Sequence, residues 1–86
     1  MPSVEELRML VKGRWRYWRR MQRLSQARIA RICGMSRSVV ARWEDPSSAA
    51  VPDVVELTMI CTAVQIKPDT TLLWLLKGAR LDEELQ

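Results

Sequence analysis

LSQARIARICGMSRSVVARWED, residues 24–45, decides how this chain folds. Ser25 is a favourable N-cap residue, so a helix is predicted over residues 26–33. Gly34 suits the left-handed conformation that ends many helices. A second short helix is then predicted over residues 37–43, capped by the serine before it. Two short helices joined by a tight glycine turn are the layout of a helix-turn-helix.

The segment before this stretch predicts one long helix. Ser3 and Glu6 match the capping-box pattern, and four apolar residues follow at helical spacing: Leu7, Val11, Trp15 and Trp18. Gly13 costs about 1 kcal/mol relative to alanine inside a helix. The helix therefore either continues to residue 22 or breaks near Gly13, and a continuous helix is preferred. Arginines project from the side opposite the tryptophans, with one at the boundary: Arg16, Arg20 and Arg23, with Arg19.

Two more helices are predicted after a loop over residues 45–52. The fourth opens at Pro52 and Asp53 in DVVELTMICTAV, with five apolar side chains inward: Val54, Leu57, Ile60, Cys61 and Val64. Residues 66–69, IKPD, end it, and TLLWLLK forms a fifth helix that ends at Gly78. We expect an all-α, compact five-helix bundle over residues 1–78, with the helix-turn-helix at about residues 25–44 and a C-terminal tail over residues 79–86.

Charge is distributed unevenly along the 86 residues. Lys and Arg number 14 against 10 Asp and Glu, for a net charge of +4, and residues 12–42 hold ten basic residues and no acid. A concentrated positive field favours a polyanionic partner. Cys33 and Cys61 lie in apolar stretches and are interpreted as buried small hydrophobic residues. No run approaches the length needed to span a bilayer, so a cytoplasmic protein is expected.

Catalytic and cofactor sites are not predicted. The chain has no histidine, which excludes zinc fingers and Cys-His nucleophile pairs. It has no phosphate-binding loop, no nucleophile elbow and no paired carboxylates beside an apolar cleft. We therefore expect no enzyme activity, no metal, no cofactor and no small-molecule substrate.

Seven residues of the central stretch occupy the places that a helix-turn-helix fills with apolar or small residues: Ile29, Ala30, Cys33, Gly34, Met35, Val40 and Trp43. On these residues the chain resembles the Xre/Cro family of phage-repressor-like DNA-binding proteins, over roughly residues 14–78. The resemblance implies a lambda-repressor-like DNA-binding fold. It also implies a structural ion pair between Arg19 and Glu44, which would join the first and third helices.

The sequence departs from the family pattern at three places. Arg23 stands where the family often has glycine before Leu-Ser-Gln. Asp45 and Pro46 follow Glu44, where a glycine is common, and Ala41 replaces a frequent serine of the second helix of the motif. These changes bear on the contacts with the DNA backbone.

The side of the 37–43 helix opposite Val40 and Trp43 is expected to enter the major groove. Its candidate base-reading residues are Arg37, Ser38, Val39 and Arg42. An arginine fork fits guanine O6 and N7, and a valine can touch a thymine methyl group. Contacts with the DNA backbone are expected from the start of the preceding helix and from exposed arginines: Ser25, Gln26, Arg16, Arg20, Arg23, Arg28 and Arg31.

Three tryptophans, Trp15, Trp18 and Trp43, are expected in the core. The fifth helix is apolar on more than one side, so one apolar side can pack on the domain and another is left over. We expect the remaining side to form a dimer surface, made by Leu73, Trp74, Leu76 and Lys77. A homodimer would present two recognition helices to a palindromic operator.

The sequence therefore predicts a sequence-specific regulator of transcription that binds double-stranded DNA, of bacterial or phage origin, with repression favoured over activation. Two alternatives stay open. WRYWRRM, residues 15–21, resembles a cationic helix at a membrane surface, but the motif needs both tryptophans internally, so no membrane partner is expected. The same fold also serves in antitoxins and adaptors, in which a toxin or RNA polymerase is the protein partner and DNA binding is secondary.

Overall fold

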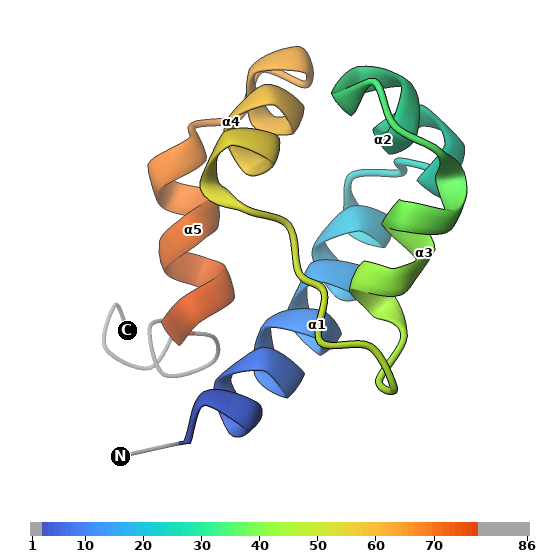
Figure 1. The fold of residues 1–86 in the computed structure, drawn as a ribbon. Helices are drawn as coiled ribbons and strands as arrows, with labels where there is room; N and C mark the ends of the chain where they lie inside the picture. Colours follow the sequence, from blue (N-terminus) through green and yellow to red (C-terminus); the bar gives the residue numbers. More distant parts are fainter. Residues whose placement is uncertain (1–2, 78–86) are drawn as a thin grey trace.

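Five α-helices make up the part of the chain that the computed structural model describes, residues 3–77 (Figure 1). They are α1 (Val4–Met21), α2 (Gln26–Cys33), α3 (Arg37–Glu44), α4 (Val54–Ala63) and α5 (Pro68–Lys77). No strand occurs within these residues. The predicted all-α fold with five helices is confirmed, and α1 continues through Gly13.

The long helix α1 lies between two pairs of helices and contacts a member of each. On one side α3 packs against it, and α2 packs on α3; on the other side α5 packs against it, and α4 packs on α5 (Figure 1). A further contact, between α2 and α4, closes the bundle. None of the helices in residues 3–77 is both long and apolar enough to cross a bilayer.

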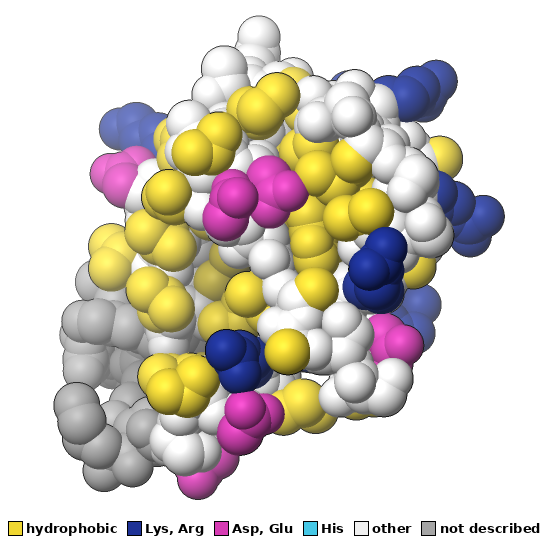
Figure 2. Space-filling model, in the orientation of Figure 1, with side chains coloured by type: hydrophobic (Ala, Val, Ile, Leu, Met, Phe, Trp, Pro, Cys, Tyr) yellow, Lys and Arg dark blue, Asp and Glu magenta, His cyan; other side chains and the backbone are white. Residues whose placement is uncertain are grey.

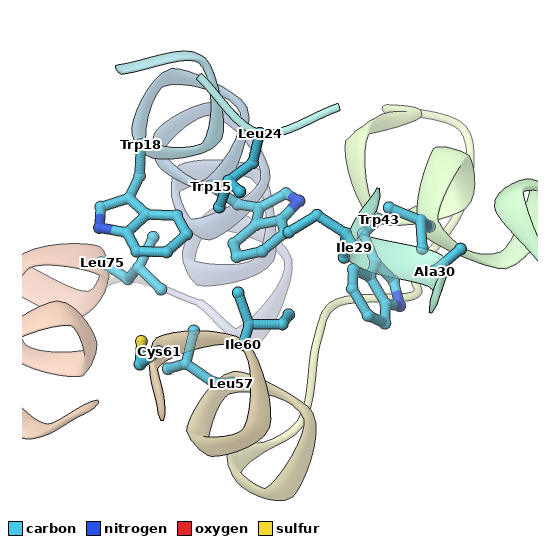
Figure 3. Close-up of a cluster of buried hydrophobic side chains, with 11 residues drawn as sticks. Trp15, Trp18, Leu24, Ile29, Ala30, Trp43, Leu57, Ile60, Cys61 and Leu75 are labelled. Atoms are coloured by element: carbon cyan, nitrogen blue, oxygen red, sulfur yellow. The ribbon is translucent and has the colours of Figure 1, made fainter. Parts of the chain in front are cut away.

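Indole rings from two helices form the centre of the core (Figure 3). Trp15 and Trp18 of α1 stack with ring centroids 5.4 Å apart, and Trp43 of α3 meets Trp15 edge-on at 5.7 Å. All three are buried, as predicted. Aliphatic side chains of α2, α3, α4 and α5 and of the loop after α1 surround them: Leu24, Ile29, Val40, Leu57, Ile60 and Leu75.

Three of the helices end in the same way, with one residue in the left-handed conformation. These residues are Arg23 after α1, Gly34 after α2 and Gln65 after α4, with φ of 57°, 66° and 61°. In each case the next amide donates to a carbonyl five residues back, a Schellman motif. The residue that carries this amide is hydrophobic and packs into the core: Leu24, Met35 and Ile66.

Glycine occupies only one of these three positions. A side chain in the left-handed region costs about 1–2 kcal/mol, which Gly34 avoids and which Arg23 and Gln65 do not. The glycine missing at position 23 therefore leaves the geometry intact and adds local strain. The inward hydrophobic residues Leu24 and Ile66 hold the chain in this conformation.

Two sequence predictions fail at the edges of the bundle. Val54, predicted inward, is 62% exposed, and Leu7, predicted on the buried stripe of α1, is 37% exposed. Side chains of a first turn point back toward the helix N-terminus, so Val54 lines an open groove of about 150 Å³ beside Val11 and Leu76. The helix α5 also starts earlier than predicted, because proline is favourable at the first helical position. The expected end at Gly78 and the tail, residues 79–86, lie outside the described residues.

Substitutions at two of the left-handed positions should change stability in opposite directions. Gly34→Ala should lower the free energy of unfolding by about 1 kcal/mol, because alanine has a Cβ that disfavours positive φ. Gln65→Gly should raise it by up to about 1 kcal/mol, because the strain is relieved and only part of the gain is lost to the freer unfolded chain. Urea denaturation followed by circular dichroism measures both, and equal signs would contradict the assignment.

Candidate nucleic-acid interface

The short helix α3 has one buried face and one exposed face. Val40 and Trp43 are buried in the core, while Arg37, Ser38 and Arg42 are exposed. Ser38 and Arg42 are four residues apart and therefore lie on one face. Val39, expected at the edge, is half-buried and packs against the core. The predicted base-reading side chains other than Val39 are thus exposed on the surface of α3.

An ion pair between Arg19 and Glu44 fixes the end of α3 on α1. Arg19 Nε donates to Glu44 Oε2 at 2.6 Å, and Nη2 donates to Oε1 at 2.9 Å. The two side chains are only 11% and 7% exposed, and Arg19 Nη1 also donates to the carbonyl of Leu24. The pair that the family resemblance implied is present, and its bidentate geometry sets the orientation of α3.

Lys12 is a second link between α1 and α3, and the sequence did not reveal it. Its side chain is buried, and Nζ donates to the carbonyl oxygens of Arg42 at 2.7 Å and of Ala50 at 2.6 Å. Burial lowers the pKa of Lys12 below its ordinary value, and the carboxylate of Asp45 partly opposes this shift. A possible signal was the spacing, because Lys12 stands three residues before Trp15 and so near the inward face of α1.

Arg14 is also held within the fold. Its guanidinium lies 5.2 Å from the centre of the Trp74 ring, and Tyr17 stacks on the same tryptophan with centroids 5.9 Å apart. Trp74 was expected on a dimer surface, but it is half-buried between α1 and α5. The physical reason is that α5 turns this face toward α1, where an arginine and a tyrosine are available to pair with the indole.

Seven of the ten basic residues of the segment 12–42 remain on the surface: Arg16, Arg20, Arg23, Arg28, Arg31, Arg37 and Arg42. Lys12, Arg14 and Arg19 are the three that the fold uses internally. Within the described residues 3–77, none of these seven arginines takes part in an ion pair. Figure 2 shows basic side chains along the side formed by α2 and α3, whereas hydrophobic side chains predominate over α4 and α5.

The two acids that follow the exposed face of α3 are both engaged. Glu44 is bound by Arg19. Asp45 Oδ1 accepts hydrogen bonds from the backbone amide of Ser47 at 2.9 Å and from its hydroxyl at 2.8 Å, and these bonds lower the pKa of Asp45. The charge of Glu44 is thus offset by Arg19, whereas Asp45 remains an exposed negative charge at the end of α3.

The start of α2 has the cap that the sequence predicted. Ser25 Oγ accepts a hydrogen bond from the amide of Arg28 at 3.0 Å, and Gln26, the first helical residue, is half-buried. Ser36 is the N-cap of α3, but its hydroxyl makes no capping bond. It lies 2.9 Å from the hydroxyl of Ser38 instead, so these two hydroxyls pair on the exposed side of α3.

The remaining residues of the expected dimer surface lie on α5. Leu73 and Leu76 are each 47% exposed, and Leu72 beside them is 36% exposed. Lys77 is the last residue of α5, and its side chain lies outside the described part of the chain. An apolar strip therefore remains on α5 even though Trp74 is packed against α1.

Glu44→Gln should lower the free energy of unfolding by about 3 kcal/mol, because it leaves the buried Arg19 charge without its counter-charge. The matched control is Glu5→Gln, which removes the exposed ion pair with Arg8 and should leave stability nearly unchanged. Thermal and urea unfolding of the two variants measure the difference. An equally small loss in both would show that the Arg19–Glu44 pair does not hold α3.

Comparison with known proteins finds no matching family model, no matching curated protein and no matching solved structure.

Proposed function

We propose that the protein is a sequence-specific double-stranded DNA-binding regulator of transcription, with α2 and α3 as a helix-turn-helix of the Xre/Cro type. The observation that carries the proposal is the division of α3. Its inner face is fixed by Val40, Trp43 and the Arg19–Glu44 pair, and its outer face presents exposed Arg37, Ser38 and Arg42. A short helix of fixed orientation with donors on its free side suits the major groove.

Base reading is assigned chiefly to the two arginines of α3. Arg37 stands in its first turn, the part of a recognition helix that enters deepest, and its guanidinium fits O6 and N7 of guanine. Arg42 lies about 1.4 turns beyond Arg37 and can read a second base or bind a phosphate. Ser38 adds a hydroxyl that can exchange its bond to Ser36 for one to DNA. Val39, being half-buried, can offer only its outer edge to a thymine methyl group.

The DNA backbone is assigned to the start of α2 and to the arginines around it. Amides at a helix N-terminus donate to phosphate oxygens, and Ser25 and Gln26 stand at that position. Arg16, Arg20, Arg23, Arg28 and Arg31 are all exposed and supply the long-range attraction. Each that contacts a phosphate adds about 0.9 to the log–log salt slope.

Homodimerisation through α5 forms part of this proposal. Leu72, Leu73 and Leu76 make an apolar strip that borders the groove beside Val54. Burying that strip against a second copy would remove it from water and give a dimer with two recognition helices, which a palindromic operator with half-sites about 34 Å apart requires. Occupancy of such a site blocks RNA polymerase, which favours repression over activation.

A second candidate is a protein-interaction module of the antitoxin or adaptor type. The observation that favours it is a half-open groove of about 440 Å³ between α1 and α5, on the side away from α3. Tyr17, Met21 and Trp74 line it with apolar and aromatic surface, and Tyr17 and Met21 are well exposed. In this function a protein partner, such as a toxin or RNA polymerase, occupies the groove and DNA binding is secondary.

Selection of bound fragments from random duplex DNA tests the first proposal. We expect a palindromic consensus, and Arg37→Ala should weaken binding to it by roughly 1–3 kcal/mol and relax discrimination at one base pair. The control Arg20→Ala should weaken all sequences similarly and reduce the salt slope by about 1. Fragments without any common sequence would contradict the proposal.

Replacement of both Leu73 and Leu76 by Glu should give a monomer, because four buried charges at a two-fold interface repel each other. Sedimentation equilibrium of the variant and the parent measures this. The variant should bind palindromic DNA no more tightly than it binds a single half-site, whereas the parent should bind the palindrome more tightly. Met59→Glu is the control, since it charges an exposed apolar residue of α4 beside α2. A parent protein that is itself monomeric on DNA would exclude the dimer.

A further inference from the structure

Lys12 is the most deeply buried charged side chain among residues 3–77, being only 3% exposed. Its ammonium lies within reach of three backbone carbonyls: Ala50 at 2.6 Å, Arg42 at 2.7 Å and Trp43 at 3.4 Å. A protonated lysine has three N–H donors and no acceptor, so three carbonyls match its hydrogen-bonding capacity.

The three carbonyls belong to the end of α3 and to the loop that follows it. Arg42 and Trp43 lie in the last turn of α3, where the carbonyls carry the partial negative charge of the helix dipole. Ala50 lies near the end of the loop between α3 and α4. A single side chain from α1 thus ties the last turn of α3 to both α1 and this loop.

Lys12 and Arg19 hold α3 in different ways. Arg19 binds the side chain of Glu44, which can rotate about its own bonds. Lys12 binds the backbone of Arg42 itself, the residue whose side chain lies on the exposed face. Arg37 stands at the other end of α3, directly after the turn at Gly34, and none of its groups bonds to Lys12 within the described residues.

We propose that Lys12 is a positioning residue for DNA reading: by binding the carbonyls of Arg42 and Trp43 it sets the direction from which the Arg42 side chain reaches the duplex. This inference rests on the proposed function. It assigns Lys12 an effect on one end of the recognition helix and not on the other.

Satisfying the carbonyls at the end of α3 is one role of Lys12, because an apolar residue at this position would leave them without this donor. Moving an ammonium out of water also carries a desolvation cost, which the three carbonyl bonds must offset. What an apolar residue cannot do is bind the last turn of α3 at fixed distances. The gain from Lys12 therefore lies in the orientation of that turn.

A double-mutant cycle on the duplex selected by the wild-type protein tests the inference. We expect Lys12→Met to weaken binding about fivefold or more in the parent, and to have little further effect when Arg42→Ala is already present. The matched cycle with Arg37→Ala should be additive, because Arg37 lies at the other end of α3. If Arg42→Ala relaxes the preference at a base pair, Lys12→Met should relax it at the same base pair and at no other.

Additive effects in the cycle with Arg42, or a loss on random duplex DNA that Arg42→Ala does not share, would overturn the assignment. Circular dichroism and thermal unfolding check that each variant folds. If Lys12→Met does not fold, Lys12→Gln is used in its place, because glutamine keeps an N–H donor. If neither variant folds, Lys12 is a stability residue and the assignment fails. A wild-type protein that selects no sequence refutes the proposed function itself, which separates the two failures.

Discussion

The contact between Trp15 and Trp43 is the interaction on which the rest of the structure depends. An eight-residue helix is not stable alone in water, so α3 depends on the packing of its inner face against α1 and α2. Trp15 is wholly buried and touches Trp18 on one side and Trp43 on the other, and thereby joins the two halves of the bundle. Packing of the inner face fixes the position of α3, and with it the position of the exposed side chains on its outer face.

Basic residues that are close neighbours in the sequence differ in whether they are exposed or bind other parts of the fold. Within α1, Arg16 and Arg20 are exposed to solvent. Lys12, Arg14 and Arg19 instead bind groups of other elements, namely three carbonyls, an indole and a carboxylate respectively. The net charge of the segment therefore overstates the field that a partner meets. The seven arginines that remain still outnumber the acids near them, and both acids at the end of α3 are engaged.

Local chemistry could be predicted from the residues themselves, whereas long-range chemistry could be predicted only where the family resemblance implied it, as for the Arg19–Glu44 pair. Ser25 and Gly34 determine the start and end of α2 through their own backbone and side-chain geometry, so both boundaries were correct. The exposure of Arg37 and Arg42 followed from the burial of Val40 and Trp43 on the opposite face. The partners of Lys12 and Arg14 are at least 30 residues away, and no periodicity within α1 can specify which carbonyl or ring they meet.

The left-handed backbone at Arg23 has a consequence for how this sequence can change over time. Replacing Arg23 by glycine would relieve the backbone strain at this position. The same replacement would remove a positive charge from the loop between α1 and α2. At residue 23, a change that raises thermal stability therefore weakens the attraction of the protein for a negatively charged partner. A lineage selected for growth at high temperature and one selected for binding at high salt should diverge at this position.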